Sequence, residues 1–377
     1  MKSSWSQAEL NQYRRHLSLE GFGDQGQEKL CQSSVLVIGA GGLGCPVLQY
    51  LAAAGVGRIG IIDHDQVEIS NLQRQVLFQH QDVGKNKAKV AAKRLHSLNP
   101  LISIISYPEK FSEKNANEFL QDYDLVVDGT DNFASRYLIN DACLNHDLPL
   151  VHGSIHQYEG MVTVFNLDGG PTYRCLFPQQ PDSSSIPSCA EAGVIGVLPG
   201  IIGSIQALEA IKVLTKIGKP LSGKLLLYDA LKQIFRTLEL KPTIQGRQKR
   251  ELQSTLSSCN LSLRDELFEE ISEEELFETL AGKEKIQVLD VREDWERYEQ
   301  RIEPSLHQPL TELTASSKIS TPQGLDPEQK IVVYCKAGVR SRIACKALHE
   351  AGFRKLYNLS GGIDRWSTLF PEFTQSG

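Results

Sequence analysis

The chain has 377 residues, 41% of them hydrophobic, with a formal net charge of −6 at pH 7 and a sequence pI near 5.9. This length predicts two or three domains with full cores, and the charge argues against a nucleic-acid-binding protein. The eight cysteines form no C-x-x-C pair, the polar start is unlike a signal peptide, and no uninterrupted apolar run predicts a membrane span, so we expect a cytoplasmic protein with reduced thiols.

The first predicted element is a helix over 7–17. Ser6 and Glu9 have the spacing of a capping box, which marks a helix N-terminus. The helix carries the pair Arg14-Arg15, and two interpretations of this pair stay open. It is either a solvated basic face or the source of an arginine that reaches a phosphate across a dimer interface.

A glycine-rich βαβ unit follows, with the sequence SVLVIGAGGLGCPVLQYLAAAGVGRIGIID. Strands are predicted over 35–38 and 58–62, and the helix between them ends at Gly55. The glycines between the first strand and the helix have the spacing G-x-G-x-x-G, which leaves helix N–H groups free to bind a phosphate. Asp63 stands at the carboxyl end of the second strand, where an acidic residue can meet a ribose. This motif alone most often indicates a dinucleotide.

The segments after Asp63 carry polar side chains suited to a triphosphate. HDQVEISNLQRQ contains Asn71, Gln73 and Arg74, and VGKNKA places Lys87 just inside a helix predicted over 85–98. Arginine and lysine can neutralise the charge that develops when a phosphoryl group is attacked. Strands over 102–107 and 124–127, with a helix over 113–120 between them, continue the α/β alternation.

The strand over 124–127 ends in the sequence DGTDN. Asp131 is therefore expected at the carboxyl edge of a parallel sheet, where ligands of such sheets collect and where it could hold Mg²⁺ against phosphate oxygens. Its structural alternative is the N-cap of a helix predicted over 133–145, and the two roles are compatible. Further strands are predicted over 161–165 and 224–228.

Taken together, GAGGLG, Asp63, SNLQRQ, VGKNKA, GTDN and GKLLLYDA resemble the MoeB/ThiF/HesA family of adenylyltransferases, relatives of the ubiquitin-activating enzymes. The resemblance implies an α/β, Rossmann-like domain over 1–240. It also implies ATP- and Mg²⁺-dependent adenylation of the C-terminal Gly-Gly of a ubiquitin-like sulfur-carrier protein, by a homodimer in which Arg15 comes from the second subunit. The residues that it implies for ATP binding are Gly39, Gly41, Gly42, Gly44, Asp63, Ser70, Asn71, Gln73, Arg74, Lys87, Asp131 and Asn132.

The cysteines depart from this family's pattern. Members commonly hold structural zinc with two C-x-x-C pairs. Here the first pair reads Thr172-Tyr173-Arg174-Cys175, the second pair is absent, and only Cys259 lies in the region after the domain. Because structural zinc needs four ligands, we expect no zinc and a corner closed by packing alone. The resemblance places Cys189 where relatives have a cysteine that joins the carrier or resolves a disulfide; the alternative is an inert loop thiol.

The segment 241–270 is polar and then acidic and is interpreted as a linker. Beyond it, Ser272 and Glu275 form another capping box, and strands are predicted over 287–293, with charged residues at its end, and over 330–334. The second of these strands runs into the loop CKAGVRS at a helix N-terminus, where successive N–H groups stabilise an anion. We therefore expect a depressed pKa for Cys335. The loop residues are Cys335, Lys336, Ala337, Gly338, Val339 and Arg340.

LDVRE, IVVYCKAGVRS and NLSGGIDRW resemble a single-domain rhodanese, which implies a small α/β domain over 271–377. The resemblance implies that Cys335 carries a persulfide, steadied by Arg340 and the loop amides. Rhodanese-like phosphatases have five residues between the cysteine and the arginine. Here four intervene, which favours a site sized for sulfur.

The fusion of these two halves predicts a bifunctional adenylyltransferase and sulfurtransferase that converts a carrier C-terminus to a thiocarboxylate. We expect a cysteine desulfurase or thiosulfate as sulfur donor, and no nucleic-acid or membrane partner. The favoured pathway is molybdopterin cofactor synthesis, with thiamine synthesis or tRNA thiolation as alternatives that depend on a partner surface. Two other classes stay open: an NAD-dependent dehydrogenase, which leaves Arg74, Lys87 and Cys335 without roles, and a non-catalytic module that binds a ubiquitin-like protein.

Overall fold

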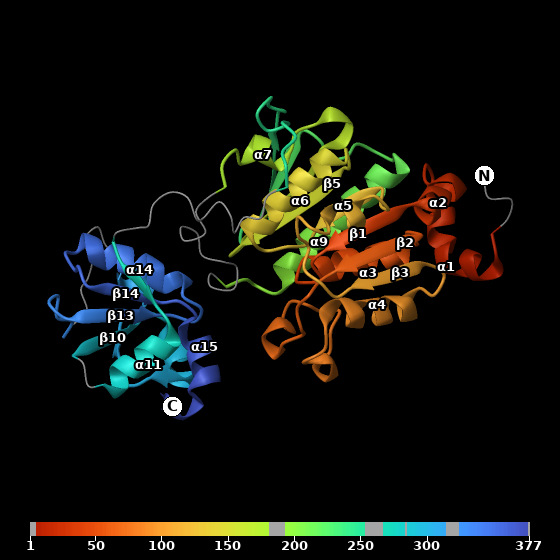
Figure 1. The fold of residues 1–377 in the computed structure, drawn as a ribbon. Helices are drawn as coiled ribbons and strands as arrows, with labels where there is room; N and C mark the ends of the chain where they lie inside the picture. The colour runs from red at the N-terminus through yellow and green to blue at the C-terminus, as the bar shows by residue number, and fades with distance from the viewer. Residues whose placement is uncertain (1–4, 181–192, 253–266, 283–284, 314–323, 376–377) are drawn as a thin grey trace. The chain divides into compact units, whose positions relative to one another are not determined.

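The computed structural model describes residues 5–180, 193–252, 267–282, 285–313 and 324–375 (Figure 1). These residues form two compact units, one in the N-terminal two-thirds of the chain and one at the C-terminal end. Each unit has its own sheet and its own hydrophobic core. The two units are therefore described one after the other.

The first unit is built on an eight-stranded mixed sheet with the order β3-β2-β1-β4-β5-β6-β7-β8. Its first five strands pair in parallel and the last three pair antiparallel. The strands are β1 Ser34–Ile38, β2 Arg58–Ile62, β3 Ser103–Tyr107, β4 Leu125–Asp128, β5 Leu150–His156, β6 Glu159–Phe165, β7 Lys224–Asp229 and β8 Ile234–Glu239. The helices are α1 Gln7–Leu17, α2 Gly23–Gln32, α3 Gly44–Ala54, α4 Lys87–Leu98, α5 Ala116–Leu120, α6 Phe133–Asn145, α7 Tyr173–Leu176 and α9 Val197–Thr215.

The predicted βαβ unit is confirmed in its details. The strand β1 leads into α3, and Gly55 caps that helix in the left-handed conformation with φ 89°, which glycine adopts without strain. The register then aligns the strand ends, because Ile38 pairs with Ile62 on one side and with Asp128 on the other. The carboxyl ends of β1, β2 and β4 consequently meet at one edge of the sheet.

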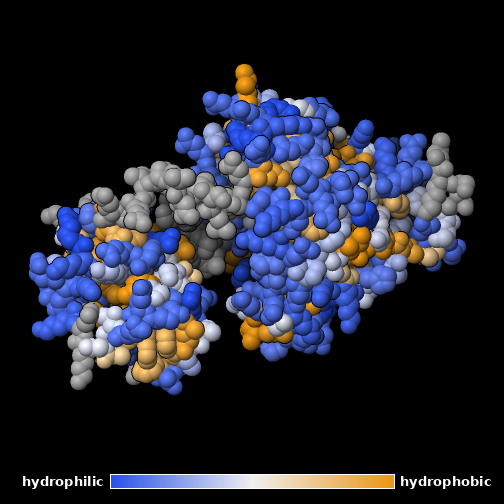
Figure 2. All heavy atoms as spheres, in the orientation of Figure 1, coloured by the Kyte–Doolittle hydropathy of each residue, from blue (hydrophilic) through white to orange (hydrophobic). Residues whose placement is uncertain are grey.

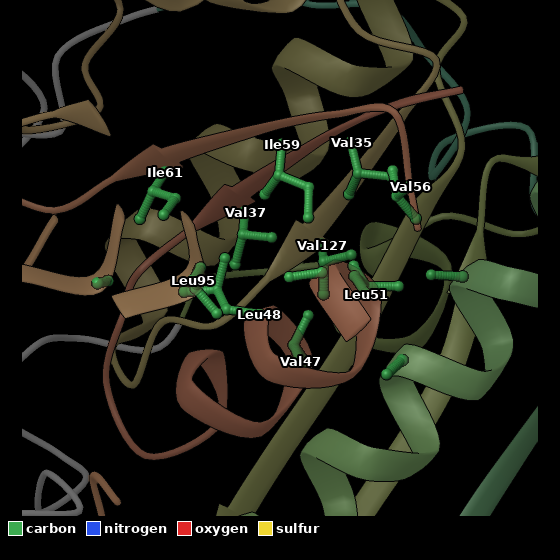
Figure 3. Close-up of a cluster of buried hydrophobic side chains, with 14 of the residues drawn as sticks. Val35, Val37, Val47, Leu48, Leu51, Val56, Ile59, Ile61, Leu95 and Val127 are labelled. Carbon is green, nitrogen blue, oxygen red and sulfur yellow. The ribbon is translucent and has the colours of Figure 1, made fainter. Parts of the chain in front are cut away.

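Helices cover both faces of this sheet. On one face α3 and α4 pack against alternate strand residues, and Figure 3 shows this cluster with Val35, Val37, Ile59 and Ile61 from the strands and Val47, Leu48, Leu51 and Leu95 from the helices. On the other face α5, α6 and α7 pack against the remaining strand residues, among them Leu36 and Val126. Strands buried on both faces explain the unbroken apolar runs of the sequence.

Among the described residues, α9 is the one helix long and apolar enough to cross a membrane by length and composition. In the structure it packs against α3, β5 and β6, with Ile202 and Ala207 buried. Helices in the core of a folded protein meet the same criteria of length and composition, so α9 is weak evidence for a membrane span. Figure 2 shows mainly hydrophilic residues on the visible face, with hydrophobic residues in separate patches.

The start of the predicted linker packs onto the first unit. The backbone N–H groups of Thr172 and Thr243 both donate to Cys175 Sγ at 3.3 Å, and Thr172 Oγ1 donates to the carbonyl of Gly246 at 2.7 Å. Burial alone would raise the pKa of Cys175, but these hydrogen bonds lower it below its usual value. The expectation that packing alone closes this corner is wrong, since hydrogen bonds join the two segments. Residues 241–252 thus lie with the first unit, beyond the boundary predicted at 240.

The second unit holds a parallel five-stranded sheet with the order β12-β10-β13-β14-β9 and a small antiparallel pair, β11 and β15. The strands are β9 Glu269–Ile271, β10 Ile286–Asp290, β11 Arg301–Ile302, β12 Leu306–His307, β13 Lys330–Tyr334, β14 Leu356–Leu359 and β15 Thr374–Gln375. The helices are α11 Glu273–Ala281, α12 Asp294–Glu299, α13 Leu310–Leu313, α14 Val339–Glu350 and α15 Gly362–Leu369. The predicted capping box of Ser272 and Glu275 is confirmed at the start of α11.

Candidate functional site

A cavity of about 780 Å³ lies at the edge of the first sheet where β1, β2 and β4 end. Eight of the residues predicted for nucleotide binding line it: Gly39, Gly41, Gly42, Asp63, Arg74, Lys87, Asp131 and Asn132. These residues come from segments up to 93 positions apart in the sequence, and the parallel pairing of the strands brings them together. The cavity is lined by both cationic and anionic side chains.

The glycine-rich loop forms one wall of the cavity. Gly39 has φ 95°, and a Cβ atom there would lie 2.8 Å from the carbonyl oxygen of Gly129. A Cβ atom at Gly44 would lie 1.9 Å from the carbonyl oxygen of Gly39. Gly44 therefore does not line the cavity but permits the tight turn that forms it.

Asp63 fixes this loop to the end of β2. Its carboxylate accepts hydrogen bonds from the backbone N–H of Ala40 at 2.7 Å and from that of Asp65 at 2.9 Å. Burial raises the pKa of Asp63, although both hydrogen bonds and the charge of Lys87 oppose the rise. The carboxylate thus has a structural role in the loop as well as a place on the cavity wall.

Lys87 is the first residue of α4, whose N-cap is Asn86. Its side chain is only 8% exposed, and Nζ lies 3.0 Å from Oδ2 of Asp65, which also lines the cavity. Asp65 was not predicted as a site residue from the sequence. Its position could have indicated a place at the site, because Asp65 lies two residues after Asp63 in the loop that follows β2.

Arg74 lies in the cavity wall because a short turn before it is ordered by hydrogen bonds. Asn71 is buried and accepts from the backbone N–H of Glu68, while Arg74 Nη1 donates to the carbonyl of Ser70 at 3.1 Å. Ser70, Asn71 and Gln73 are not among the described residues that line the cavity. They shape the turn that presents Arg74.

Asp131 and Asn132 have different positions at the end of β4. Asn132, not Asp131, is the N-cap of α6: its Oδ1 accepts from the backbone N–H of Ser135 at 2.9 Å. Asp131 is exposed in the cavity, and no side chain in the described part of the structure pairs with its carboxylate. An exposed carboxylate in this position is a suitable ligand for Mg²⁺, which binds oxygen ligands.

The wall made by residues 109–114 was missed from the sequence. The helix predicted from 113 begins at Ala116, so these residues form a loop rather than the first helical turn. Arg136 of α6 also lines the cavity and was missed, because its helical position gave no indication of which way it faces. Arg15 is exposed on α1 and is not among the described residues that line the cavity of its own unit.

The second site is the loop between β13 and α14. Cys335 is 1% exposed, and Ser341 Oγ donates to its Sγ at 3.4 Å. The loop is hydrogen-bonded to α15, because the backbone N–H of Ile363 donates to the carbonyl of Cys335 at 2.9 Å. A Cβ atom at Gly362 would lie 2.6 Å from that same carbonyl oxygen, which explains why the sequence NLSGGIDRW has glycine there. Lys336, Ala337 and Val339 are exposed around the buried sulfur.

Arg340, predicted to steady the sulfur, is paired with a carboxylate. Its guanidinium forms a bidentate ion pair with Glu296 of α12, with distances of 2.6 and 2.7 Å. The positive charge expected to steady the sulfur is therefore compensated by a carboxylate. A second buried pair, Asp290 with Arg292, lies at the end of β10, where Tyr334 also donates to Asp290. Cys189, predicted as a catalytic cysteine, lies outside the described residues.

Comparison with protein families decides what this architecture is. The ThiF family model matches residues 13–248, which is more than half of the chain. The chain belongs to the ThiF family. A model of the rhodanese-like domain matches residues 273–369 of this ThiF-family chain, in agreement with the second sheet. The α/β fold class predicted for both halves is therefore confirmed.

Curated relatives share one or both halves. The ThiF-family chain is 40% identical to the probable adenylyltransferase/sulfurtransferase MoeZ of Mycobacterium tuberculosis, over 97% of this chain and 94% of that protein. It is 39% identical to the adenylyltransferase and sulfurtransferase MOCS3 of Arabidopsis thaliana, over 97% and 85%. It is 56% identical to the sulfur carrier protein adenylyltransferase of Thermus thermophilus, over 63% and 89%. The chain is thus an enzyme of the class that joins an adenylyltransferase to a sulfurtransferase.

Solved structures match the ThiF-family half. Escherichia coli MccB with ATP has a TM-score of 0.55 at 23% identity, over 63% of this chain and 73% of that chain. A structure of PaaA has a TM-score of 0.54 at 23% identity, over 64% and 78%. At this level of identity the likeness shows a common fold.

Proposed function

We propose that the first unit uses ATP to adenylate the C-terminal Gly-Gly carboxylate of a ubiquitin-like sulfur-carrier protein, and that the second unit supplies the sulfur that turns this carboxylate into a thiocarboxylate. The observation that carries the proposal is the cavity in which the glycine-rich loop, Arg74, Lys87 and Asp131 face one space. This arrangement suits a triphosphate more than a nicotinamide cofactor, because a dehydrogenase needs neither the two cations nor the free carboxylate.

The adenylation step needs alignment rather than covalent catalysis. An oxygen of the carrier carboxylate attacks the α-phosphorus, the bond to the bridging oxygen breaks, and pyrophosphate leaves with the electron pair. Arg74 and Lys87 offset the repulsion between the two anions and the charge on the leaving group. Asp131 would hold Mg²⁺, which supplies further positive charge at the phosphate oxygens. Asp65 keeps the Lys87 ammonium at the cavity wall before nucleotide arrives.

The sulfur step proceeds through Cys335. Its thiolate takes a sulfane sulfur from a donor, with sulfite as the leaving group if the donor is thiosulfate. The terminal sulfur of the persulfide then attacks the acyl carbon, and AMP leaves. The resulting acyl disulfide is cleaved by a second thiol, either Cys189 or a cellular thiol, which releases the thiocarboxylate and forms a disulfide with Cys335.

The proposal also covers the oligomeric state, the location in the cell, the sulfur donor and the pathway. We propose a homodimer in the cytoplasm, in which Arg15 of one subunit reaches the nucleotide of the other. The proposed donor is a cysteine desulfurase or thiosulfate, and the proposed pathway is molybdopterin cofactor synthesis, ahead of thiamine synthesis and tRNA thiolation. MoeZ and MOCS3, matched over nearly the whole chain, carry names of the same double activity and support the assignment.

The test is ATP–pyrophosphate exchange with the full chain against a panel of purified carrier proteins that end in Gly-Gly. Exchange should require one of these carriers and Mg²⁺, and Arg74→Ala and Lys87→Ala should each slow it by about a hundredfold or more. Asp131→Ala should abolish the metal-dependent reaction. Lys85→Ala is the matched control, because Lys85 is exposed two residues before Lys87. Normal exchange by the Asp131 variant would contradict the assignment.

A further inference from the structure

A buried hydrogen-bonded pair lies next to the loop that carries Asp131. Asp128 ends β4, His152 lies opposite it on the parallel strand β5, and both side chains are 1% exposed. His152 Nδ1 is 2.8 Å from Oδ2 of Asp128. Neither residue is among those that line the cavity, so no step of the proposed chemistry uses this pair.

The hydrogen bonds define the state of this pair. An ionised carboxylate only accepts hydrogen bonds, so Nδ1 of His152 carries the proton and donates it to Asp128. Nε2 of His152 is buried, and no hydrogen-bond partner for it exists among the described residues. A proton there would be buried without an acceptor, and burial together with the charge of Arg136 lowers the pKa of His152 against the opposing effect of Asp128. The pair is therefore a neutral imidazole on an ionised carboxylate.

The other oxygen of Asp128 shapes the loop itself. Oδ1 accepts from both the backbone N–H and the hydroxyl of Thr130, at 2.9 and 2.6 Å. Arg136 Nη2 donates to the carbonyl of Thr130 at 3.2 Å, and Gln206 Nε2 donates to the carbonyl of Asp128 at 2.8 Å. Thr130 is thus fixed at its amide, its hydroxyl and its carbonyl, and Asp131 is the next residue.

The same loop is joined to the glycine-rich loop. The backbone N–H of Gly129 donates to the carbonyl of Ile38 at 2.8 Å, and Gly39 approaches Gly129 so closely that neither position has room for a Cβ atom. Rotation of the Asp128 carboxylate would break its hydrogen bonds to Thr130 and move the Asp131 carboxylate, while the backbone contact between Gly129 and Gly39 keeps the glycine-rich wall in place. His152 holds the carboxylate oxygen of Asp128 that Thr130 does not contact.

We propose that Asp128 and His152 form a positioning pair, which holds the Gly129–Asn132 loop so that the Asp131 carboxylate faces the metal and the phosphates. This inference rests on the proposed function, since it assigns Asp131 to a nucleotide-bound Mg²⁺. His152 acts through Asp128 and Thr130 and touches no reacting atom. Residues that orient metal ligands typically change metal affinity by about 10- to 100-fold when they are removed.

The test compares His152→Leu with His152→Asn in the full chain. The amide Nδ2 of asparagine stands where Nδ1 of histidine stands, so His152→Asn keeps the donor to Asp128, whereas His152→Leu removes it. In His152→Leu the Mg²⁺ concentration for half-maximal pyrophosphate exchange should rise by about tenfold or more. By calorimetry its affinity for MgATP should fall, while its affinity for ATP in EDTA should stay unchanged. His152→Asn should restore both readouts to within about twofold of the natural chain, well below the change of about 10- to 100-fold expected for loss of an orienting residue.

Two further variants separate positioning from packing. Phe165→Leu removes a buried ring whose centroid lies 5.6 Å from that of His152, and it leaves every hydrogen bond of the pair in place. It should lower the unfolding temperature without changing the Mg²⁺ requirement. Thr130→Val removes the hydroxyl that donates to Asp128 and provides the same test if His152→Leu does not fold; it should raise the Mg²⁺ requirement in the same direction.

Three results would overturn the inference. One is that His152→Leu and Thr130→Val behave like Phe165→Leu, with lower stability and an unchanged Mg²⁺ requirement. The second is failure of His152→Asn to restore the requirement. The third is equal affinity of the natural chain for ATP with and without Mg²⁺. Absence of exchange with every carrier would instead contradict the proposed function, and the calorimetric comparison would still test the positioning pair.

Discussion

Two cations at the candidate sites are paired with carboxylates rather than left free. Lys87 pairs with Asp65, whose side chain is 52% exposed, whereas Arg340 pairs with Glu296, whose side chain is 10% exposed. A half-exposed partner gives a weak pair that an incoming phosphate can displace. A buried bidentate pair is held at fixed geometry, and removing one partner leaves an uncompensated charge. Lys87 is thus available to a ligand, while Arg340 holds the Cys335 loop against α12.

The pair of Arg340 and Glu296 predicts a pH dependence of stability. Burial raises the pKa of Glu296, but the hydrogen bonds and charge of Arg340 lower it below its ordinary value near 4.5. Because the folded-state pKa is the lower one, the stabilisation is fully present above about pH 4.5 and is lost as the pH falls through the folded-state pKa. The stability difference between the natural chain and Glu296→Gln should therefore shrink below pH 4.5.

This prediction can be measured by urea unfolding followed through the fluorescence of the buried Trp366, in a chain whose other two tryptophans, Trp5 and Trp295, are replaced by phenylalanine. Glu328→Gln is the control, since the side chain of Glu328 is 88% exposed. A difference between the natural chain and Glu296→Gln that stays constant from pH 6 to pH 3.5 would show that Arg340 does not depend on this carboxylate.

At the scale of elements, hydrogen bonds between the start of α7 and residues 243–246 join the segment after 240 to the first unit. Thr172 and Thr243 donate their backbone N–H groups to Cys175, and Gly246 lies so close that a Cβ atom would be 2.5 Å from the sulfur. The four positions 172, 175, 243 and 246 reproduce the spacing of two C-x-x-C pairs, with one cysteine in four. One sulfur, two threonines and a glycine do not form a tetrahedral zinc site.

The metal prediction follows from this corner. Purified protein should contain less than one equivalent of zinc by elemental analysis, and a chelator should leave the unfolding temperature unchanged. Cys175→Ser should cost only about 1 kcal/mol, because a hydroxyl oxygen can accept the same hydrogen bonds. A full equivalent of zinc that is lost in Cys175→Ser would reveal ligands beyond those that the structure describes.

At the scale of the molecule, the two candidate sites lie in units that fold around separate cores. The residues assigned to adenylation all precede 240, and the loop assigned to sulfur begins at Cys335. No described residue belongs to both sites. The two half-reactions should therefore be separable by single substitutions.

Cys335→Ala should abolish sulfur transfer from thiosulfate, because the sulfur-carrying thiol of the loop is gone, and it should leave formation of the acyl adenylate intact. Cys189→Ala should keep adenylation and persulfide loading and slow release of the thiocarboxylate. Intact-mass spectrometry with carrier, ATP and donor follows each species. Cys345→Ala is the control, since Cys345 is a buried cysteine of the same unit. Thiocarboxylate at the normal rate from Cys335→Ala would mean that sulfur reaches the adenylated carrier from another protein.

Local features of the chain could be predicted without the structure. The helix over 7–17, the glycine-rich βαβ unit and the helix over 133–145 depend on caps, glycines and apolar runs within about 15 residues, and the structure has all three. Each motif of the two sets also lies in a single short segment, so the motifs together indicated the two domain types. What failed locally was the start of α5, because Glu113 and Lys114 have helical composition but form part of the cavity wall.

The sequence by itself determined the elements, the glycine turn and the identity of the two domains, because each depends on neighbours along the chain. Only the tertiary structure decided the partners of the charged and polar groups. Asp65 meets Lys87, Thr243 meets Cys175 and His152 meets Asp128 because the sheet order and the fold of the tail bring distant segments together. Side-chain pairing between segments depends on which strand is adjacent and in which register, and no local pattern carries that information.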